Sequence, residues 1–176
     1  MKRQIALSMA ALLVLGAFSE AMALDGWRDR TGLLYGAHFG GGSAKSDADG
    51  AKARLGYNVG ARVGGGVTEK LTLDASMNYR ADDKDSVETS SLSLSLGGNF
   101  FLAEGFFVRA GAGLVNFSSS GAGSEDQTGM GFGAGMGYEF FANADLAVGV
   151  AGNFDYQTFD DFNLQVFTIN VTSTLY

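Results

Sequence analysis

The sequence predicts an all-β fold, namely a closed eight-stranded antiparallel transmembrane β-barrel with short periplasmic turns and longer extracellular loops. Three observations predict it. From Gly32 onward, apolar side chains alternate with small or polar ones, and a period of two indicates strands with two different faces. The connectors between these segments are short and long in turn. After Ala23, the sequence contains no apolar run near the roughly 20 residues that a membrane helix requires.

The first 23 residues are typical of a targeting segment. Lys2 and Arg3 form a positively charged start, residues 5–18 are mostly apolar, and Ala21-Met22-Ala23 matches the small-residue pattern of a cleavage site. We therefore predict a cleaved signal peptide over residues 1–23 and an outer-membrane barrel over residues 24–176. Such a signal implies export across the inner membrane.

Eight segments carry the alternation. In residues 53–63, one face reads Ala, Leu, Tyr, Val, Ala and Val, and the other reads Arg, Gly, Asn, Gly and Arg. Most of the segments are near the length of a tilted membrane strand, about 9–11 residues. The predicted strands are residues 33–40, 53–63, 71–80, 91–97, 106–114, 129–140, 146–155 and 162–176.

The connectors support a barrel with two different ends. Short connectors are expected at residues 66–69, 102–105 and 142–145, and longer polar ones at residues 43–51, 81–90, 118–127 and 157–161. Short turns on one side and an even number of strands are typical of outer-membrane barrels. Both termini then lie on the short-turn side. A soluble β-sandwich also has alternating strands, but the polar face here is nearly all glycine, serine and scattered charge.

Aromatic residues on the apolar face are expected to form two interfacial girdles. One comprises Phe106, Tyr138 and Phe140 beside short connectors, and the other comprises Tyr79, Phe154 and Phe162 toward long ones.

The last segment has the weakest alternation. Phe167, Ile169, Val171 and Leu175 share one phase, whereas Thr172 and Thr174 share the other with Tyr176. A β-bulge would shift this register, so the sequence leaves the lipid-facing phase open.

The chain resembles the small outer-membrane barrels of the OmpA/OmpX type over residues 24–176. The signal segment, the eight alternating segments and the terminal aromatic Tyr176 carry the resemblance. It implies location in the outer membrane of a Gram-negative bacterium, and contact with outer-membrane lipids and lipopolysaccharide. It also implies that the barrel assembly machinery reads the C-terminal strand ending at Tyr176.

Four charged residues fall at inward positions near the short connectors: Arg62, Asp74, Arg109 and Glu139. A buried charge without a partner is strongly destabilising, so we expect a charge network. Adjacent strands make Arg62–Asp74 and Arg109–Glu139 the expected pairs. Eight strands leave an interior just wide enough for side chains. We therefore expect a closed lumen, with an ionic plug that rearranges to pass ions as the alternative.

Residues 129–137 place glycine at every second, inward position. Long side chains from other strands can reach across such a wall, and Arg62, Arg80, Arg109 and Phe107 are the candidates. The sequence leaves open whether they fill the lumen or leave a file of water.

These features predict a structural or surface-interaction role, with a lumen filled by charged and small polar residues. The alternatives are a narrow, low-conductance porin-like channel and, third, an enzyme that modifies lipid A. Known barrel enzymes of that third class use His with Ser and an acid, but His38 is the only histidine and has no His-x-Ser motif. We therefore predict no catalytic residues, no cofactor and no metal site, and no enzymatic function.

The charge of the chain indicates its partners. The formal net charge is −7, which argues against a nucleic-acid partner. Carboxylates concentrate in the expected long connectors, where divalent cations would bridge them to anionic lipopolysaccharide, since hard cations prefer oxygen ligands. These are Asp47, Asp49, Asp82, Asp83, Asp85, Glu88, Glu125, Asp126, Asp160 and Asp161.

Overall fold

A computed structural model describes residues 29–48, 50–84, 87–120 and 125–176. The predicted signal peptide, residues 1–23, and the predicted first mature residue, Leu24, lie outside the described residues. Within the described part of the chain, no helix is long and apolar enough to cross a membrane.

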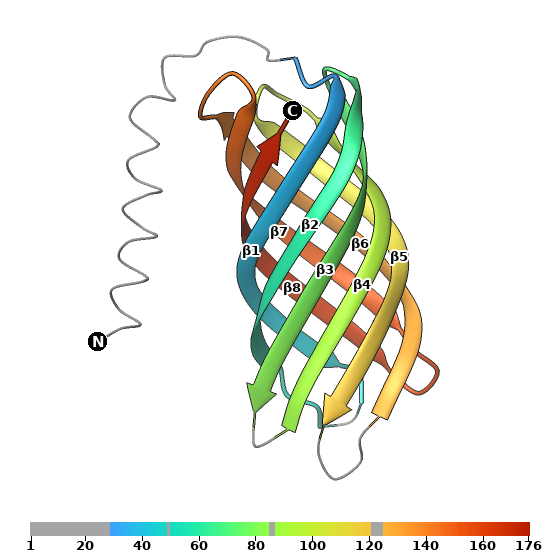
Figure 1. Cartoon of the computed structure of the whole chain (residues 1–176). Helices are drawn as coiled ribbons and strands as arrows, with labels where there is room; N and C mark the ends of the chain where they lie inside the picture. The colour runs from blue at the N-terminus through green and yellow to red at the C-terminus, as the bar shows by residue number, and fades with distance from the viewer. Residues whose placement is uncertain (1–28, 49, 85–86, 121–124) are drawn as a thin grey trace, which may run out of the picture.

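Eight strands form one antiparallel sheet that closes on itself (Figure 1). β8 pairs with β1 as well as with β7, so the sheet has no free edge. The predicted fold class is thereby confirmed. The strands are β1 (Gly32–Ser46), β2 (Arg54–Thr68), β3 (Leu71–Lys84), β4 (Val87–Phe101), β5 (Phe106–Ser120), β6 (Glu125–Phe141), β7 (Leu146–Thr158) and β8 (Asn163–Leu175).

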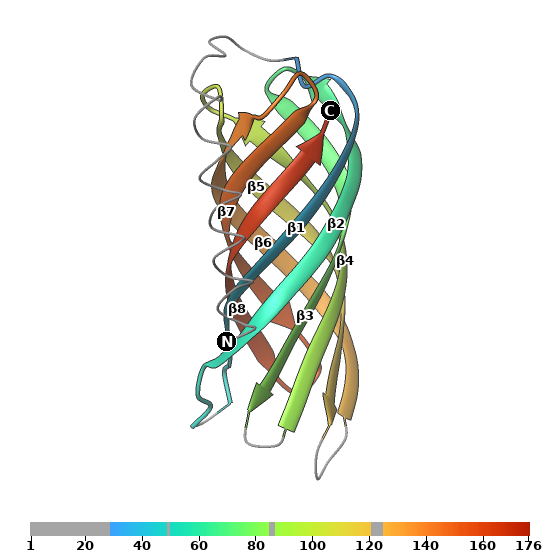
Figure 2. The same ribbon diagram turned by 60° about the vertical axis from the view of Figure 1, so that its left-hand side comes forward.

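The strands are staggered around the barrel. Paired residues followed from Tyr35 of β1 through all eight strands lead back to Lys45 of β1, 10 residues farther along. Such a stagger requires the strands to tilt against the barrel axis, as Figures 1 and 2 show. The start of β1 and the C-terminus lie at one end, which we call the turn end. The opposite end, where β1, β3, β5 and β7 finish, is the tip end.

Burial is reversed relative to a water-soluble protein. Outward-facing Leu55 and Leu96 are 79% and 72% exposed, whereas inward-facing Thr72 and Asn99 are fully buried, at 0%. A continuous apolar surface of this extent is expected only against another apolar phase. The outward face therefore fits lipid, and the polar residues occupy the lumen.

The first seven strands are longer than the sequence pattern predicts, whereas β8 begins and ends within the predicted segment. β1 has 15 residues and β6 has 17, because both continue into segments expected to be long connectors. Outward residues in these extensions are polar and exposed, so the strands project beyond the apolar band at the tip end. An apolar period cannot mark such an extension, because no apolar face is present there. The residues are Lys45, Asp83, Glu88, Asn116, Asp126 and Gln165.

β8 settles the register that the sequence left open. It pairs with β1 and β7 without a register shift. Its residues between 46% and 56% exposed are Phe167, Ile169, Val171 and Leu175, so this phase faces outward and Tyr176 belongs to the inward phase. The irregularity lies instead in β2, between Gly66 and Thr68.

One girdle assignment is wrong. Phe162 does not face outward, because the chain turns into the barrel mouth after β7. Its ring centroid lies 5.2 Å from that of Phe117 and 4.8 Å from that of Phe159.

The outward face generates a stability prediction. Leu96 lies in the middle of β4 and is 72% exposed. Leu96→Arg should lower the free energy of unfolding in lipid vesicles by about 2–4 kcal/mol, because a lipid-facing charge near the bilayer midplane loses its hydration. Urea titration in vesicles measures the change. The inward neighbour Ser93→Ala is the control and should have little effect; equal losses for both would contradict the assignment of faces.

Candidate functional site

The lumen is the candidate site, because the inward positions gather the buried polar and charged side chains. These side chains project into the lumen at three levels. We call them the latch at the turn end (Arg30, Glu139, Tyr176), the charge layer (Arg62, Asp74, Arg109) and the apolar cap at the tip end (Phe117, Phe159, Phe162 and the side chains they contact).

The latch joins both ends of the chain to β6. Arg30 precedes β1 and is 1% exposed. Its Nε donates to Glu139 Oε1 at 2.9 Å, and the Tyr176 hydroxyl donates to the same oxygen at 2.8 Å. Arg30 Nη2 also donates to the backbone oxygen of Glu104. The guanidinium lies 3.9 Å from the ring centroid of Phe101, within the range of a cation–π contact.

The expected Arg109–Glu139 pair is therefore wrong. The register places Arg109 opposite Gly135, so Glu139 lies four residues nearer the turn end. Arg30 supplies the missing cation there. Sequence reasoning missed Arg30 because it precedes the first strand and carries no alternation signal.

Asp74 organises the charge layer. Arg109 Nη1 and Nη2 donate to its two carboxylate oxygens at 2.7 and 2.6 Å, which is the bidentate geometry that arginine favours. Arg62 Nη1 lies 4.0 Å from Asp74 Oδ2, and Arg62 Nη2 donates to Thr174 Oγ1 at 2.6 Å. The structure thus brings together three of the four predicted residues, with Arg109 as the main partner of Asp74.

Glycine provides the room that Arg62 needs. A Cβ atom at Gly36 would lie 2.6 Å from Arg62 Nε, so the arginine crosses the wall of β1 where no side chain exists. The inward glycines are therefore matched to the long side chains of neighbouring strands.

A second ionic cluster lies near the tip end. Arg80 Nη1 donates to Asp82 Oδ2 at 2.7 Å, and Arg54 Nε donates to Asp82 Oδ1. Asp82 is 5% exposed, although the sequence pattern placed it in a loop. The longer β3 explains the difference, because it carries the alternation of faces past Arg80.

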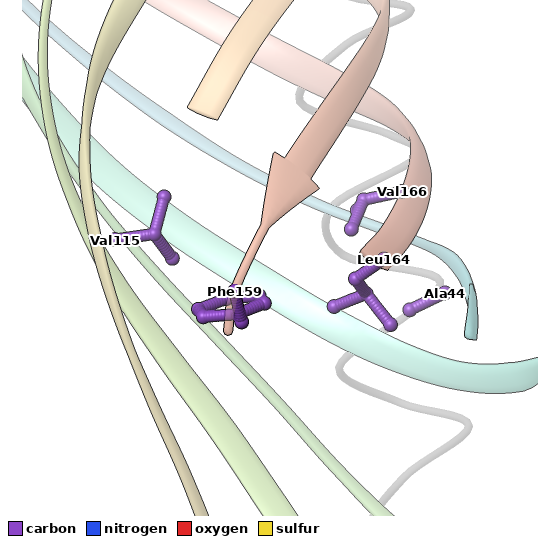
Figure 3. Close-up of a cluster of buried hydrophobic side chains, with 5 residues drawn as sticks. All are labelled: Ala44, Val115, Phe159, Leu164 and Val166. Carbon is purple, nitrogen blue, oxygen red and sulfur yellow. The ribbon is translucent and has the colours of Figure 1, made fainter. Parts of the chain in front are cut away.

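Figure 3 shows the buried part of the apolar cap, namely Ala44, Val115, Phe159, Leu164 and Val166. Val115, Leu164 and Val166 are buried inside the barrel mouth and pack with Phe159, while Phe117 and Phe162 pack against the group. The connector after β7 is held beside this cap, since Gln127 donates to Asp161 at 2.8 Å and the side chain of Asn163 donates to Asp47 at 2.7 Å. The backbone N–H of Asn163 also bonds to Asp47 and holds the pKa of that carboxyl below its usual range.

A polar chamber of about 140 Å³ lies between the charge layer and the cap. His38 lines this chamber and hydrogen-bonds the side chain of Asn78. Ser76, which also lines the chamber, shares a 2.9 Å hydrogen bond with Ser95. Among the described residues, no three His, Cys, Asp or Glu side chains gather as metal ligands would.

The sharing of Asp74 generates a second prediction. Asp74→Asn leaves two guanidinium groups without a carboxylate, and removing one partner of a buried pair lowers stability by about 3–5 kcal/mol. Arg62→Met keeps the bidentate Arg109–Asp74 pair, so its loss should be clearly smaller. Urea unfolding in lipid vesicles compares the two variants. Equal losses would mean that Asp74 does not serve both arginines.

Solved structures resemble this barrel at low sequence identity. Neisserial surface protein A has 13% identity and a TM-score of 0.62, over 81% of this chain and 96% of that one. Ail, the attachment invasion locus protein of Yersinia pestis, has 14% identity and a TM-score of 0.58, over 81% and 98%. The N-terminal β-barrel domain of Pseudomonas aeruginosa OprF has 14% identity and a TM-score of 0.52, over 84% and 100%.

At these identities, the likenesses establish the fold alone. No curated protein matches the sequence. The profile of one sequence family, described as "Outer membrane protein beta-barrel domain", matches residues 10–173. With the closed barrel and the reversed burial, this match shows that the chain belongs to the outer-membrane protein β-barrel domain family.

Proposed function

We propose that the chain is a structural and surface-interaction protein of the Gram-negative outer membrane that does not conduct ions. The turn end would lie in the periplasm, and the strand extensions of the tip end would project from the cell. The closed lumen carries this proposal, because the latch, the charge layer and the apolar cap block it in series. The names of two similar structures, a surface protein and an attachment protein, agree with such a role.

The alternatives fit the side-chain positions less well. A lipid A-modifying enzyme would need His38 to reach a lipid, but His38 lines the chamber inside the lumen. A channel would need a continuous polar path, whereas Phe117, Phe159 and Phe162 cap one end.

Because three layers of side chains lie across the lumen one after another, we predict that the barrel does not conduct ions. The wild-type protein in planar bilayers should show no steady current in potassium chloride. Arg30→Ala should remain silent, because the charge layer and the cap still close the lumen. A steady conductance of the wild type would favour the channel, and one that appears only in Arg30→Ala would make the latch a gate.

For the surface partner, we propose lipopolysaccharide, bridged by divalent cations. Asp83 and Glu88 are directly opposite each other on β3 and β4, and both are exposed. Like charges at such a cross-strand pair are destabilising, and a divalent cation with oxygen ligands would relieve the repulsion. Asp49 and Asp85, part of the same predicted acidic surface, lie outside the described residues.

This bridge predicts a calcium-dependent stabilisation. With lipopolysaccharide present, calcium should raise the Tm of the wild-type barrel, measured by the gel-mobility change on heating. Asp83→Asn/Glu88→Gln should lose this increase, yet be as stable as the wild type or more stable without calcium. Asp126→Asn, which alters a carboxylate opposite Ser118, is the control and should keep it. Equal responses of all three proteins would contradict the bridge.

Recognition of the last strand by the assembly machinery remains part of the proposal. In the folded barrel, the Tyr176 hydroxyl is bonded to Glu139. Any reading of this aromatic residue would therefore precede closure of the latch.

A further inference from the structure

The chamber has a polar wall whose hydrogen-bonding capacity is not used. Asn58 Oδ1, Asn170 Oδ1 and Gln157 Oε1 are buried acceptors without a partner among the described residues, and Arg80 Nε is a buried donor in the same condition. All four side chains line the chamber, and each is between 4% and 7% exposed. Buried polar atoms are nearly always hydrogen-bonded, so the chamber requires an occupant.

Three of these side chains lie in one row. Arg80 of β3 is opposite Asn58 of β2, and Gly40 of β1 pairs with Asn58 on one side and with Asn170 of β8 on the other. A Cβ atom at Gly40 would lie 2.3 Å from Asn170 Oδ1. The glycine therefore lets the two amide groups approach the same part of the wall. The paired positions thus place these polar side chains side by side on one part of the chamber wall.

The arginines beside the chamber already have carboxylate partners. Arg62 and Arg109 both lie beside Asp74, and Arg54 and Arg80 share Asp82. An anion entering the chamber would lose its hydration without finding a positive charge that is free. The occupant that fits is neutral, donates to three oxygen acceptors and accepts from one N–H group.

The volume limits the size of that occupant. A cavity of about 150 Å³ is known to hold a benzene-sized molecule, and this chamber has about 140 Å³. A molecule of about six non-hydrogen atoms therefore fits. Hydroxyl groups both donate and accept, so a small polyol supplies both kinds of bond.

We propose that the chamber is a binding compartment for a small, uncharged, hydrogen-bonding solute, for which glycerol is the probe. The row of Arg80, Asn58 and Asn170 would bind it from one side, and Gln157 would complete its hydrogen bonds. This compartment goes beyond the surface role proposed above and does not depend on it.

The test uses the signals of the side-chain amides themselves. The full-length mature protein is refolded from urea into detergent micelles with increasing glycerol, so that the solute is present before the barrel closes. NMR spectra follow the NH₂ signals of Asn58, Asn170 and Gln157. These signals should shift and saturate with glycerol. Sucrose is too large for the chamber, so these signals should shift only in proportion to the sucrose concentration, as expected for a change of solvent.

A filled chamber provides the matched control. Ser93→Leu places a larger side chain on the chamber wall and should abolish the saturable shifts, whereas Leu94→Ile, on the outward face of the same strand, should retain them. If Ser93→Leu fails to fold, the comparison of glycerol with sucrose in the wild-type protein is sufficient to test the proposal. Absent shifts, or equal linear shifts with both solutes, would overturn the proposal and leave water as the occupant.

Discussion

Closure of the backbone hydrogen bonds is the constraint on which the rest of this structure depends. Lipid offers no partner for N–H and C=O groups, so a sheet can cross a bilayer only when it has no edge. The pairing of β1 with β8 meets this requirement. The stagger of 10 residues between Tyr35 and Lys45 then fixes the tilt of the strands, and with it the width of the lumen. Inward side chains must fit the space that this geometry leaves.

The turn end shows how the closure is secured beyond the backbone. A single oxygen, Glu139 Oε1, accepts from Arg30 before the first strand and from Tyr176 after the last. The bonds at this carboxylate can form together only when the two ends of the chain meet at β6. Because these groups are buried, removing any one partner lowers stability, since it leaves another polar group without a hydrogen bond and away from water. The latch is therefore coupled to completion of the barrel.

The sequence predicted those features that depend on side chains within one strand. Alternation located all eight strands and the faces of the first seven, because lipid and lumen impose opposite requirements on successive residues; the lipid-facing phase of β8 stayed open. It did not predict partners across the lumen: Asp74 binds Arg109 two strands away, and Glu139 binds Arg30 from outside the sheet. Those contacts depend on stagger and on side-chain length. The strand ends were also misjudged, because residues such as Asp82 and Asp83 lie beyond the apolar band and carry no alternating signal.

Inward glycines provide room for the side chains of neighbouring strands along the lumen. Toward the turn end, the inward glycines face long side chains: Arg62 crosses Gly36, and Phe107 contacts the position of a Cβ atom at Gly137. In the middle, the paired inward residues Gly97, Gly111 and Gly133 adjoin one another on three successive strands. Side chains reach this wall as well, because a Cβ atom at Gly97 would lie 3.3 Å from Arg109 Nη2 and one at Gly133 would lie 2.2 Å from Asp155 Oδ1. The bidentate bonds to Asp74 therefore hold the Arg109 guanidinium close to Gly97, while Gly111 and Gly133 form part of the chamber wall.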